Sequence, residues 1–185
     1  MYLRKLFNSG KTVFSSEDLG KILEIINKNY LKVVLSRLAK RSDLTRIKKG
    51  LYVINEHYNN FELANKLKRP SYISIETVLF NNNVIFQDYS KKITSVANNS
   101  YKETIKGVDF FYYKIKDEIL TNPSGLVFDD NFVIASIERA VCDMIYLSKN
   151  FYFDNLENIN KNRLKEISQI YNKRVIKEVE KICSR

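Results

Sequence analysis

Lysine, arginine and amide side chains recur at regular spacing between residues 28 and 49 of this chain. Five of them have the spacing that gathers side chains on one face of a helix: Lys28, Asn29, Lys32, Ser36 and Arg37. Five more follow at the end of that helix and in the segment after it: Lys40, Arg41, Arg46, Lys48 and Lys49. Cationic side chains bind phosphate oxygens, and lysine and amide groups can also pair with base edges. The pattern therefore favours contact with a polyanion.

The apolar residues between these side chains predict the helix that carries the first set. They follow the i, i+3, i+4, i+7 pattern of a helix with one buried face: Leu31, Val34, Leu35 and Leu38. Asn27 comes just before and can cap the free N–H groups of the first turn. Helical geometry then turns the polar set outward, together with Val33.

Position along this helix suggests a role for each polar residue. Lys28, Asn29 and Lys32, near its start, have the donor and acceptor chemistry for base readout, whereas Ser36 and Arg37 suit either bases or phosphates. The cations at its end, residues 40 and 41, suit the helix dipole as well as a phosphate, so their charge alone decides nothing.

The alternating segment that follows predicts a basic β-hairpin. Residues 44–48 alternate as a short strand, Gly50 can supply a positive φ in a tight turn, and residues 51–54 are rich in strand formers. Arg46, Lys48 and Lys49 are expected at phosphates or in a minor groove, whereas Tyr52 could equally be core. Residues 2–8 and the segment from Ser15 predict two earlier helices, with Leu3, Leu6 and Phe7 of the first turned inward.

Helix, short strand, helix, turn, helix and hairpin is the order of a winged helix-turn-helix. In that fold the basic helix would enter a major groove and the hairpin would lie along the adjacent backbone. We therefore expect an α+β protein with a winged helix-turn-helix DNA-binding domain over residues 1–55 and a mixed α/β domain over residues 56–185.

Positive charge is concentrated in the first third of the chain. Residues 1–54 hold twelve Lys and Arg against four Asp and Glu, whereas the remaining residues hold nineteen against seventeen. A basic surface favours nucleic acid or an anionic membrane face. RNA would satisfy the same electrostatics, although no aromatic ribonucleoprotein signature or GXXG clamp is present. A merely solvated surface of a lysine-rich protein is the remaining alternative.

The second domain is expected to mix helices and strands. Helices are predicted over residues 72–79 and 136–148, and twice near the C-terminal end. Residues 61–67 suggest a short helix, with an extended bridge as the alternative. Strands are predicted near residues 93–96, 108–115 and 132–134, with a turn at residues 98–100.

Residues for catalysis, metal binding or cofactor binding do not stand out. His57 lies in a polar connector and is expected at the surface. Glu138 and Asp143 are five positions apart on one predicted helix, so they would not face each other as an acid–base pair. No metal spacing, phosphate loop or nucleophile elbow is present. We expect no enzyme, no catalytic residue, no metal and no cofactor.

The cysteines and the apolar runs bear on the cellular compartment. Cys142 and Cys183 lie far apart among apolar residues and are expected to be reduced thiols rather than a disulfide. No apolar run approaches the roughly 18 to 20 residues of a membrane helix. We expect a cytoplasmic protein without a membrane partner.

Several segments resemble one protein family. FSSEDLGKILEIINKNYLKVVLSRLAKRSDLTRIKKGLYVI is similar to the N-terminal winged-helix domain of AbiEi-type antitoxins of type IV toxin-antitoxin, or abortive-infection, systems. PSYISIETVLF, TSVANN and ASIERAVCDMIYL resemble successive pieces of that family's C-terminal domain. The resemblance covers most of residues 12–148. Ser42 departs from it, because such proteins often place a glycine after the recognition helix.

The resemblance implies a function that composition alone does not. Members repress their own operon by binding inverted repeats upstream of it, and they counter a nucleotidyltransferase-like toxin without needing a stable complex. It implies double-stranded DNA as a partner, with contacts at the helix and hairpin residues named above, and a possible dimer on DNA.

Two other functions remain open. The protein could be an antitoxin that grips its toxin directly, with Phe110, Phe111, Tyr112 and Tyr113 as a candidate contact patch. It could also be a winged-helix transcription factor of an unrelated regulon that shares only the fold.

Overall fold

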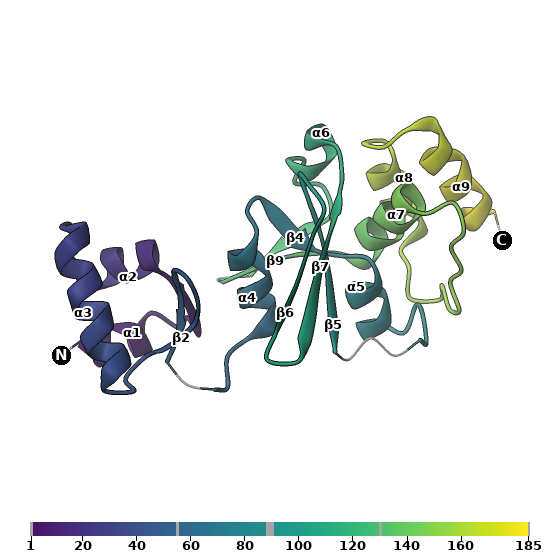
Figure 1. The fold of residues 1–185 in the computed structure, drawn as a ribbon. Coiled ribbons are helices and arrows are strands. Elements are labelled where there is room, and N and C mark those ends of the chain that lie inside the picture. Colours follow the sequence, from purple (N-terminus) through teal and green to yellow (C-terminus); the bar gives the residue numbers. More distant parts are fainter. Residues whose placement is uncertain (1, 55, 88–90, 130, 185) are drawn as a thin grey trace. The chain divides into compact units, whose positions relative to one another are not determined.

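The chain forms two compact units, Met1–Leu67 and Lys68–Arg185, which we call unit 1 and unit 2. The computed structural model describes residues 2–54, 56–87, 91–129 and 131–184 (Figure 1). Both units combine helices with a β-sheet, which confirms the mixed α+β class.

Unit 1 contains four described helices and a three-stranded antiparallel sheet. The helices are α1 (Tyr2–Asn8), α2 (Ser16–Leu23), α3 (Lys28–Lys40) and α4 (Asn60–Leu67). The strands are β1 (Val13–Ser15), β2 (Thr45–Lys48) and β3 (Leu51–Val53), in the order β1-β3-β2. The predicted sequence of helices, short strand and hairpin is therefore present.

Local capping and burial explain where the helices of unit 1 begin. Ser15 accepts a hydrogen bond from the backbone N–H of Asp18, and Asp18 accepts in return from the backbone N–H of Ser15, which forms a capping box. Asn27 caps α3, as predicted. All four apolar residues of the predicted buried face of α3 lie in the core. The prediction for Phe7 is wrong, because 59% of it is exposed while Leu6 fills that part of the core.

Helix α4 belongs to unit 1, so the boundary lies after Leu67 and not at the expected residue 55. Polar contacts with β1 and α2 hold it there. Glu62 accepts hydrogen bonds from the backbone N–H groups of Thr12, at 2.8 Å, and Val13, at 3.2 Å. Lys66 Nζ lies 2.7 Å from Asp18 Oδ2. The sequence placed α4 in the second domain because a polar connector precedes it.

The partners of Asp18 make the stability of unit 1 depend on pH. Burial alone would raise the pKa of Asp18, but hydrogen bonds from Lys66 and Ser15 outweigh it and hold the pKa well below the usual range. A carboxyl group with a lowered folded-state pKa stabilises the fold above its unfolded pKa of about 3.9, and this contribution is lost as the pH falls further. We therefore expect the stability lost between pH 7 and pH 3 to be smaller in Asp18→Asn than in the wild type.

Urea unfolding at both pH values, followed by hydrogen exchange in residues 1–67, measures this difference. Glu17→Gln is the matched control, because the Glu17 side chain is 73% exposed. An equal loss of stability on acidification in both variants would contradict the assigned role of Asp18.

Unit 2 contains a six-stranded mixed sheet. Its strands are β4 (Ser71–Ile73), β5 (Lys92–Ala97), β6 (Tyr101–Ile105), β7 (Val108–Lys114), β8 (Leu126–Phe128) and β9 (Val133–Ala135). Their order is β6-β7-β5-β4-β9-β8, with β5 parallel to β7 and β4 parallel to β9. The predicted helix over residues 72–79 is wrong in its first part, because Tyr72 lies in β4 and pairs with Val96. Strands β6 and β8 were not predicted.

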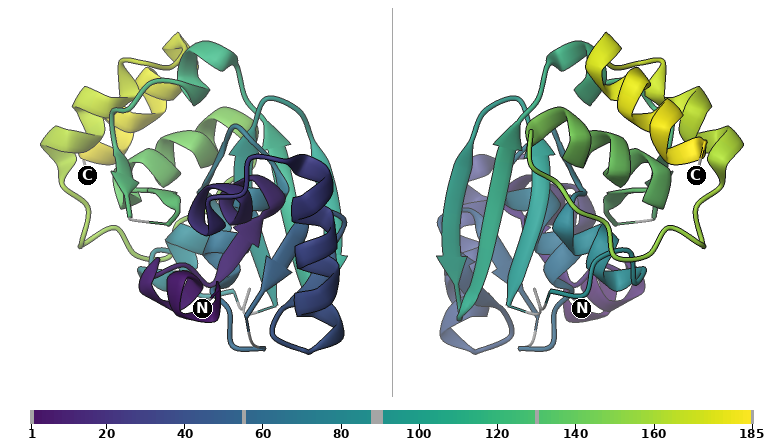
Figure 2. Two further views of the ribbon diagram at one scale, coloured as in Figure 1. Left: turned by 90° about the vertical axis from the view of Figure 1, so that its left-hand side faces the viewer. Right: turned by 90° about the vertical axis from the view of Figure 1, so that its right-hand side faces the viewer.

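Helices cover one face of this sheet. They are α5 (Glu76–Asn81), α6 (Asp117–Leu120), α7 (Ile137–Leu147), α8 (Lys161–Ser168) and α9 (Lys173–Cys183). Helices α5 and α7 lie beside the sheet and contact each other, and α8 and α9 pack on α7 from outside (Figure 2). Among the residues described, no helix combines the length and apolar character required to cross a membrane.

A buried polar cluster joins the sheet of unit 2 to its helices. Arg139 and Asp143 lie on α7 with no exposed surface. The Asp143 carboxylate accepts hydrogen bonds from the hydroxyls of Tyr72, Ser74 and Tyr171, at 3.0, 2.7 and 2.7 Å. Burial raises the pKa of Asp143, whereas Arg139 and the three hydroxyl donors oppose that shift. We call these five residues the buried polar cluster.

The guanidinium group of Arg139 also fixes the loop before β8. It donates to the backbone carbonyl groups of Ile119, at 2.6 Å, and Ser124, at 2.7 Å, and to the hydroxyl of Tyr72, at 2.9 Å. Its Nε lies 3.8 Å from Asp143 Oδ1. The side chain thus connects α7 to β4, to α6 and to the loop after α6.

Two glycines of unit 2 provide a matched test of this close packing. A Cβ atom on Gly125, whose φ is +74°, would lie 2.7 Å from Ile167 Cδ1 and 2.9 Å from Arg139 Cβ, whereas one on Gly107, at φ +80°, would meet nothing within 4 Å. We expect Gly107→Ala to lower the free energy of unfolding by about 1 to 2 kcal/mol, from its backbone conformation alone. Gly125→Ala should cost about 1 to 3 kcal/mol more because it also overpacks the core. Denaturant unfolding of both variants measures the difference, and equal losses would contradict the close packing.

Candidate nucleic-acid interface

The outer face of α3 carries the polar side chains that the sequence placed there. All seven of these residues are exposed: Lys28, Asn29, Lys32, Ser36, Arg37, Lys40 and Arg41. In the hairpin Arg46 and Lys49 are exposed and Lys48 is partly buried, whereas Tyr52 is 9% exposed and belongs to the core. The predicted exposure is therefore correct for the helix and for most of the hairpin.

A groove of about 640 Å³ between α3 and the β2–β3 hairpin brings half of the candidate residues together. They are Lys32, Ser36 and Lys40 from α3, and Arg46 and Lys49 from the hairpin. Lys28 and Lys32 also line an adjoining, more apolar cavity of about 500 Å³. The other four candidates, Asn29, Arg37, Arg41 and Lys48, line neither.

A backbone hydrogen bond ties the hairpin to the start of α2. The backbone N–H of Ser16, at the start of α2, donates to the carbonyl oxygen of Gly50 at 2.9 Å. The register of β2 against β3 shifts between Arg46 and Lys48, which is a β-bulge or a similar irregularity. Arg46 Nε donates to the Lys48 carbonyl oxygen at 3.4 Å, within the hairpin.

Five of the candidate cations have no acidic partner within the described part of the chain: Lys28, Lys32, Arg37, Lys40 and Lys49. Other acidic groups of unit 1 pair with cations outside this set. Glu24 pairs with Lys5 at 2.9 Å, and Asp18 pairs with Lys66. Among the candidates, only Arg41 has an ion pair between described residues, with Asp43 at 3.2 Å. The positive potential along α3 is therefore largely uncompensated.

The end of α3 includes Ser42, the residue at which the sequence departs from the family that it resembles. Ser42 has φ +59°, in the left-handed region that favours glycine. The Asp43 N–H donates to the Leu38 carbonyl oxygen at 3.0 Å, which closes the helix end. Serine thus occupies a left-handed position of the kind that glycine most often fills at a helix end.

Three exposed apolar residues lie at or near the start of α3. Ile26 precedes the helix and is 97% exposed, whereas Tyr30 and Val33 lie within it and are 51% and 45% exposed. The sequence placed Val33 on the outer face but did not single out Ile26 or Tyr30.

The described residues also bear on metal binding and on thiol chemistry. They include no group of three or more His, Cys, Asp or Glu side chains placed to hold a metal ion. Burial raises the pKa of the Cys142 thiol, so this group is not an activated nucleophile. Comparison of the chain with protein-family models and with curated proteins gave no match.

Proposed function

We propose that unit 1 is a winged helix-turn-helix that binds double-stranded DNA. Helix α3 enters the major groove, with Lys28, Asn29 and Lys32 toward the bases, and the β2–β3 hairpin lies along the adjacent phosphate backbone. The observation that carries this proposal is the shared groove, which sets cations of α3 opposite cations of the hairpin. These cations face each other across a groove and lack acidic partners. Contacts with the phosphates of a DNA backbone explain that arrangement better than solvation alone.

We further propose that the protein represses its own operon and acts as the antitoxin of a type IV toxin-antitoxin module against a nucleotidyltransferase-like toxin. The support is the resemblance to AbiEi-type antitoxins described above. Binding as a dimer to an inverted repeat follows from that resemblance.

Direct capture of the toxin by aromatic side chains of β7 has less support. Phe110 and Tyr112 are 0% and 2% exposed, so half of the candidate patch is core. The ring of Phe111 is covered by Lys92 and Lys102, whose Nζ atoms lie 4.8 and 4.5 Å from its centroid. Only Tyr113 remains, and it lines a cavity of unit 2.

A mobility shift with the DNA upstream of the protein's own gene tests the proposal. We expect retention in two steps on an inverted repeat, resistant to unrelated competitor DNA at physiological salt. Binding that ignores sequence and disappears as salt rises would reduce the groove to a generic polyanion surface. Retention on that DNA with no change in expression of the operon in cells would contradict autorepression.

A further inference from the structure

The apolar cavity of about 500 Å³ in unit 1 has walls that contact with DNA phosphates does not explain. It lies between α2 and the first half of α3, and we call it the α2–α3 cavity. Leu31 and Leu35 of the core line it, together with Ile25, which is half-buried. Ile26, which is 97% exposed, lies at its edge. Apolar walls with a few polar groups, at this size, are typical of a small-molecule site.

The turn between α2 and α3 holds the two isoleucines in place. Glu24 has φ +58°, and the Ile25 N–H donates to the Gly20 carbonyl oxygen at 2.9 Å, which closes the end of α2. On the other side, Asn27 caps the first turn of α3. The exposed side chain of Ile26 therefore stands on a fixed backbone, which limits the entropy lost when a ligand covers it.

The charged side chains that line the α2–α3 cavity leave an excess of positive charge. Glu17 pairs with Lys21 at 2.6 Å, so these two charges compensate each other. Lys28 and Lys32 are four positions apart and project from one face of α3, and neither has an acidic partner among the described residues. The first turn of α3 contains no acidic residue, so the positive end of the helix dipole adds to their charge. The cavity thus favours an anion.

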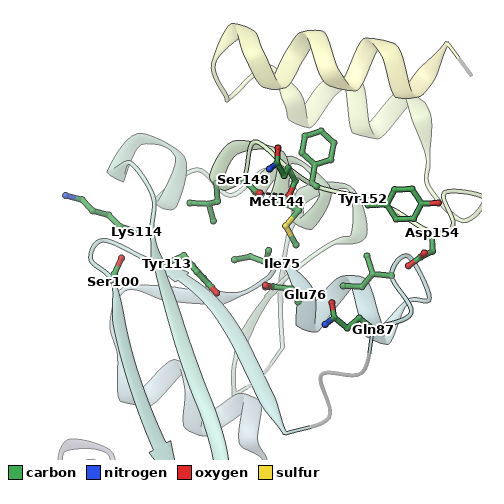
Figure 3. Close-up of a pocket in the computed structure, with 14 residues that line it drawn as sticks. Ile75, Glu76, Gln87, Ser100, Tyr113, Lys114, Met144, Ser148, Tyr152 and Asp154 are labelled. Atoms are coloured by element: carbon green, nitrogen blue, oxygen red, sulfur yellow. Dashed lines mark hydrogen bonds between the residues drawn. The ribbon is translucent and has the colours of Figure 1, made fainter.

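The cavity of unit 2 at Glu76, of about 640 Å³, shows no such preference (Figure 3). Acidic and basic residues both line it, namely Glu76, Asp154 and Lys114, and the Lys114 side chain extends away from it. Glu76 Oε1 already lies 3.5 Å from Lys92 Nζ. The charges at this cavity therefore do not favour one class of ligand.

We propose that the α2–α3 cavity binds a small amphipathic anion, a carboxylate on an unbranched apolar tail. The carboxylate lies between Lys28 and Lys32, and the tail covers Ile25 and Ile26. Lys32 also lines the groove beside the hairpin, so a bound anion excludes DNA from this part of α3. This exclusion rests on the proposed function, whereas binding of the anion does not.

Isoleucine labelling of the full chain tests the site. A ¹³C-methyl isoleucine sample reports on Ile25 and Ile26, whose signals Ile25→Val and Ile26→Val assign. We expect decanoate, kept below its micelle-forming concentration, to shift both signals in a saturable manner. Decyltrimethylammonium, which has the same tail and the opposite charge, should leave them unchanged. From hexanoate to decanoate the affinity should rise about two- to fourfold per methylene, because each one buries more apolar surface.

Two double variants test the role of the lysines. Replacing Lys28 and Lys32 with glutamine should weaken decanoate binding about three- to thirtyfold, because two exposed charge contacts are lost. Replacing Lys165 and Lys173 with glutamine makes the same change in charge on α8 and α9 and should leave binding unchanged. All four residues are exposed, so both variants should fold.

Four outcomes would overturn the site. They are no saturable shift with decanoate, an equal shift with decyltrimethylammonium, and unchanged affinity in the variant of Lys28 and Lys32. The fourth is binding to anionic phospholipid vesicles without a shift by monomeric decanoate, which would assign these lysines to a membrane surface.

Competition in the mobility shift tests the exclusion of DNA. Decanoate should release the upstream DNA over the concentrations at which it saturates the Ile25 and Ile26 signals. Retention of DNA at saturating decanoate would overturn the exclusion. Failure to bind DNA without any decanoate would instead contradict the proposed function, and the isoleucine signals would still decide the site.

Discussion

Replacing Arg139 with leucine is expected to lower the free energy of unfolding of unit 2 by about 3 to 5 kcal/mol. The change leaves the Asp143 carboxylate buried without its positive partner, which lies 3.8 Å away in the wild type. It also removes the donors to the carbonyl groups of Ile119 and Ser124. Each buried polar group left without a partner adds its own cost.

Urea unfolding combined with hydrogen exchange assigns this loss to a unit. Amide protons of β5 and β7 should exchange much faster in Arg139→Leu, while those of α3 in unit 1 should not change. Arg163→Leu is the control, because the Arg163 side chain is 51% exposed and its Nε lies 3.9 Å from Glu138 Oε2. A loss below about 0.5 kcal/mol in Arg139→Leu, the size of an ordinary surface substitution, would show that the buried polar cluster is not structural.

Replacing Lys40 and Lys49 together with alanine is expected to weaken binding to all DNA sequences by a similar factor. Each lysine that neutralises one phosphate contributes about 0.9 to the slope of log K against log salt, so the slope should fall by about 2. Both side chains lie in the groove between α3 and the hairpin, and neither has an ion pair among the described residues. Titrations at several salt concentrations, on specific and unrelated duplexes, measure the change.

A double variant elsewhere separates local contacts from net charge. Lys165 and Lys173 are exposed on α8 and α9 of unit 2, and replacing both changes the total charge by the same amount. Their replacement should leave the slope unchanged, and an equal effect of both double variants would contradict the proposed docking. Asn29→Ala gives the contrasting outcome, a relaxed sequence preference of about 1 to 3 kcal/mol with an unchanged slope.

Much of unit 1 could be predicted because its information is local. The buried face of α3 repeats over enough turns to define a helical period, and Gly50 marks the hairpin turn. Asn27 and Ser15 are caps that act within three residues of themselves. The position of α4 could not be predicted in the same way, since it rests on Glu62 and its hydrogen bonds to Thr12 and Val13, far away in the sequence.

The errors in unit 2 arise from short elements and distant partners. Tyr72, Ile75, Val78 and Leu79 fit a helical period, yet the first belongs to a three-residue strand that is too short to show its own alternation. Arg139 and Asp143 resembled the polar positions of an amphipathic helix. They are buried because Tyr72, Ser74 and Tyr171 supply partners from two other segments, which a helical pattern cannot reveal.

In the candidate site, too, features set by local sequence could be predicted and those set by distant partners could not. Exposure of the cations on α3 was predicted from one helix, but their grouping with the hairpin depends on the Ser16 to Gly50 hydrogen bond between two segments. The cavity at Glu76 had no sequence signal, because its walls come from α5, β7, α7 and residues 150–154.

The strand order of unit 2 has a consequence for synthesis on the ribosome. Central strand β4 pairs on one side with β5 and on the other with β9. The buried polar cluster is complete only when Tyr171, in the segment before α9, donates its hydrogen bond to Asp143. Unit 1 closes with contacts that end at Leu67, so it can fold while most of the chain is still unmade. Unit 2 must hold an incomplete sheet until β9 emerges, and during that interval the β4 edge is open to other chains. Its buried polar cluster is completed later still, by Tyr171. Nascent unit 2, rather than unit 1, is thus the part with the greatest need of chaperones.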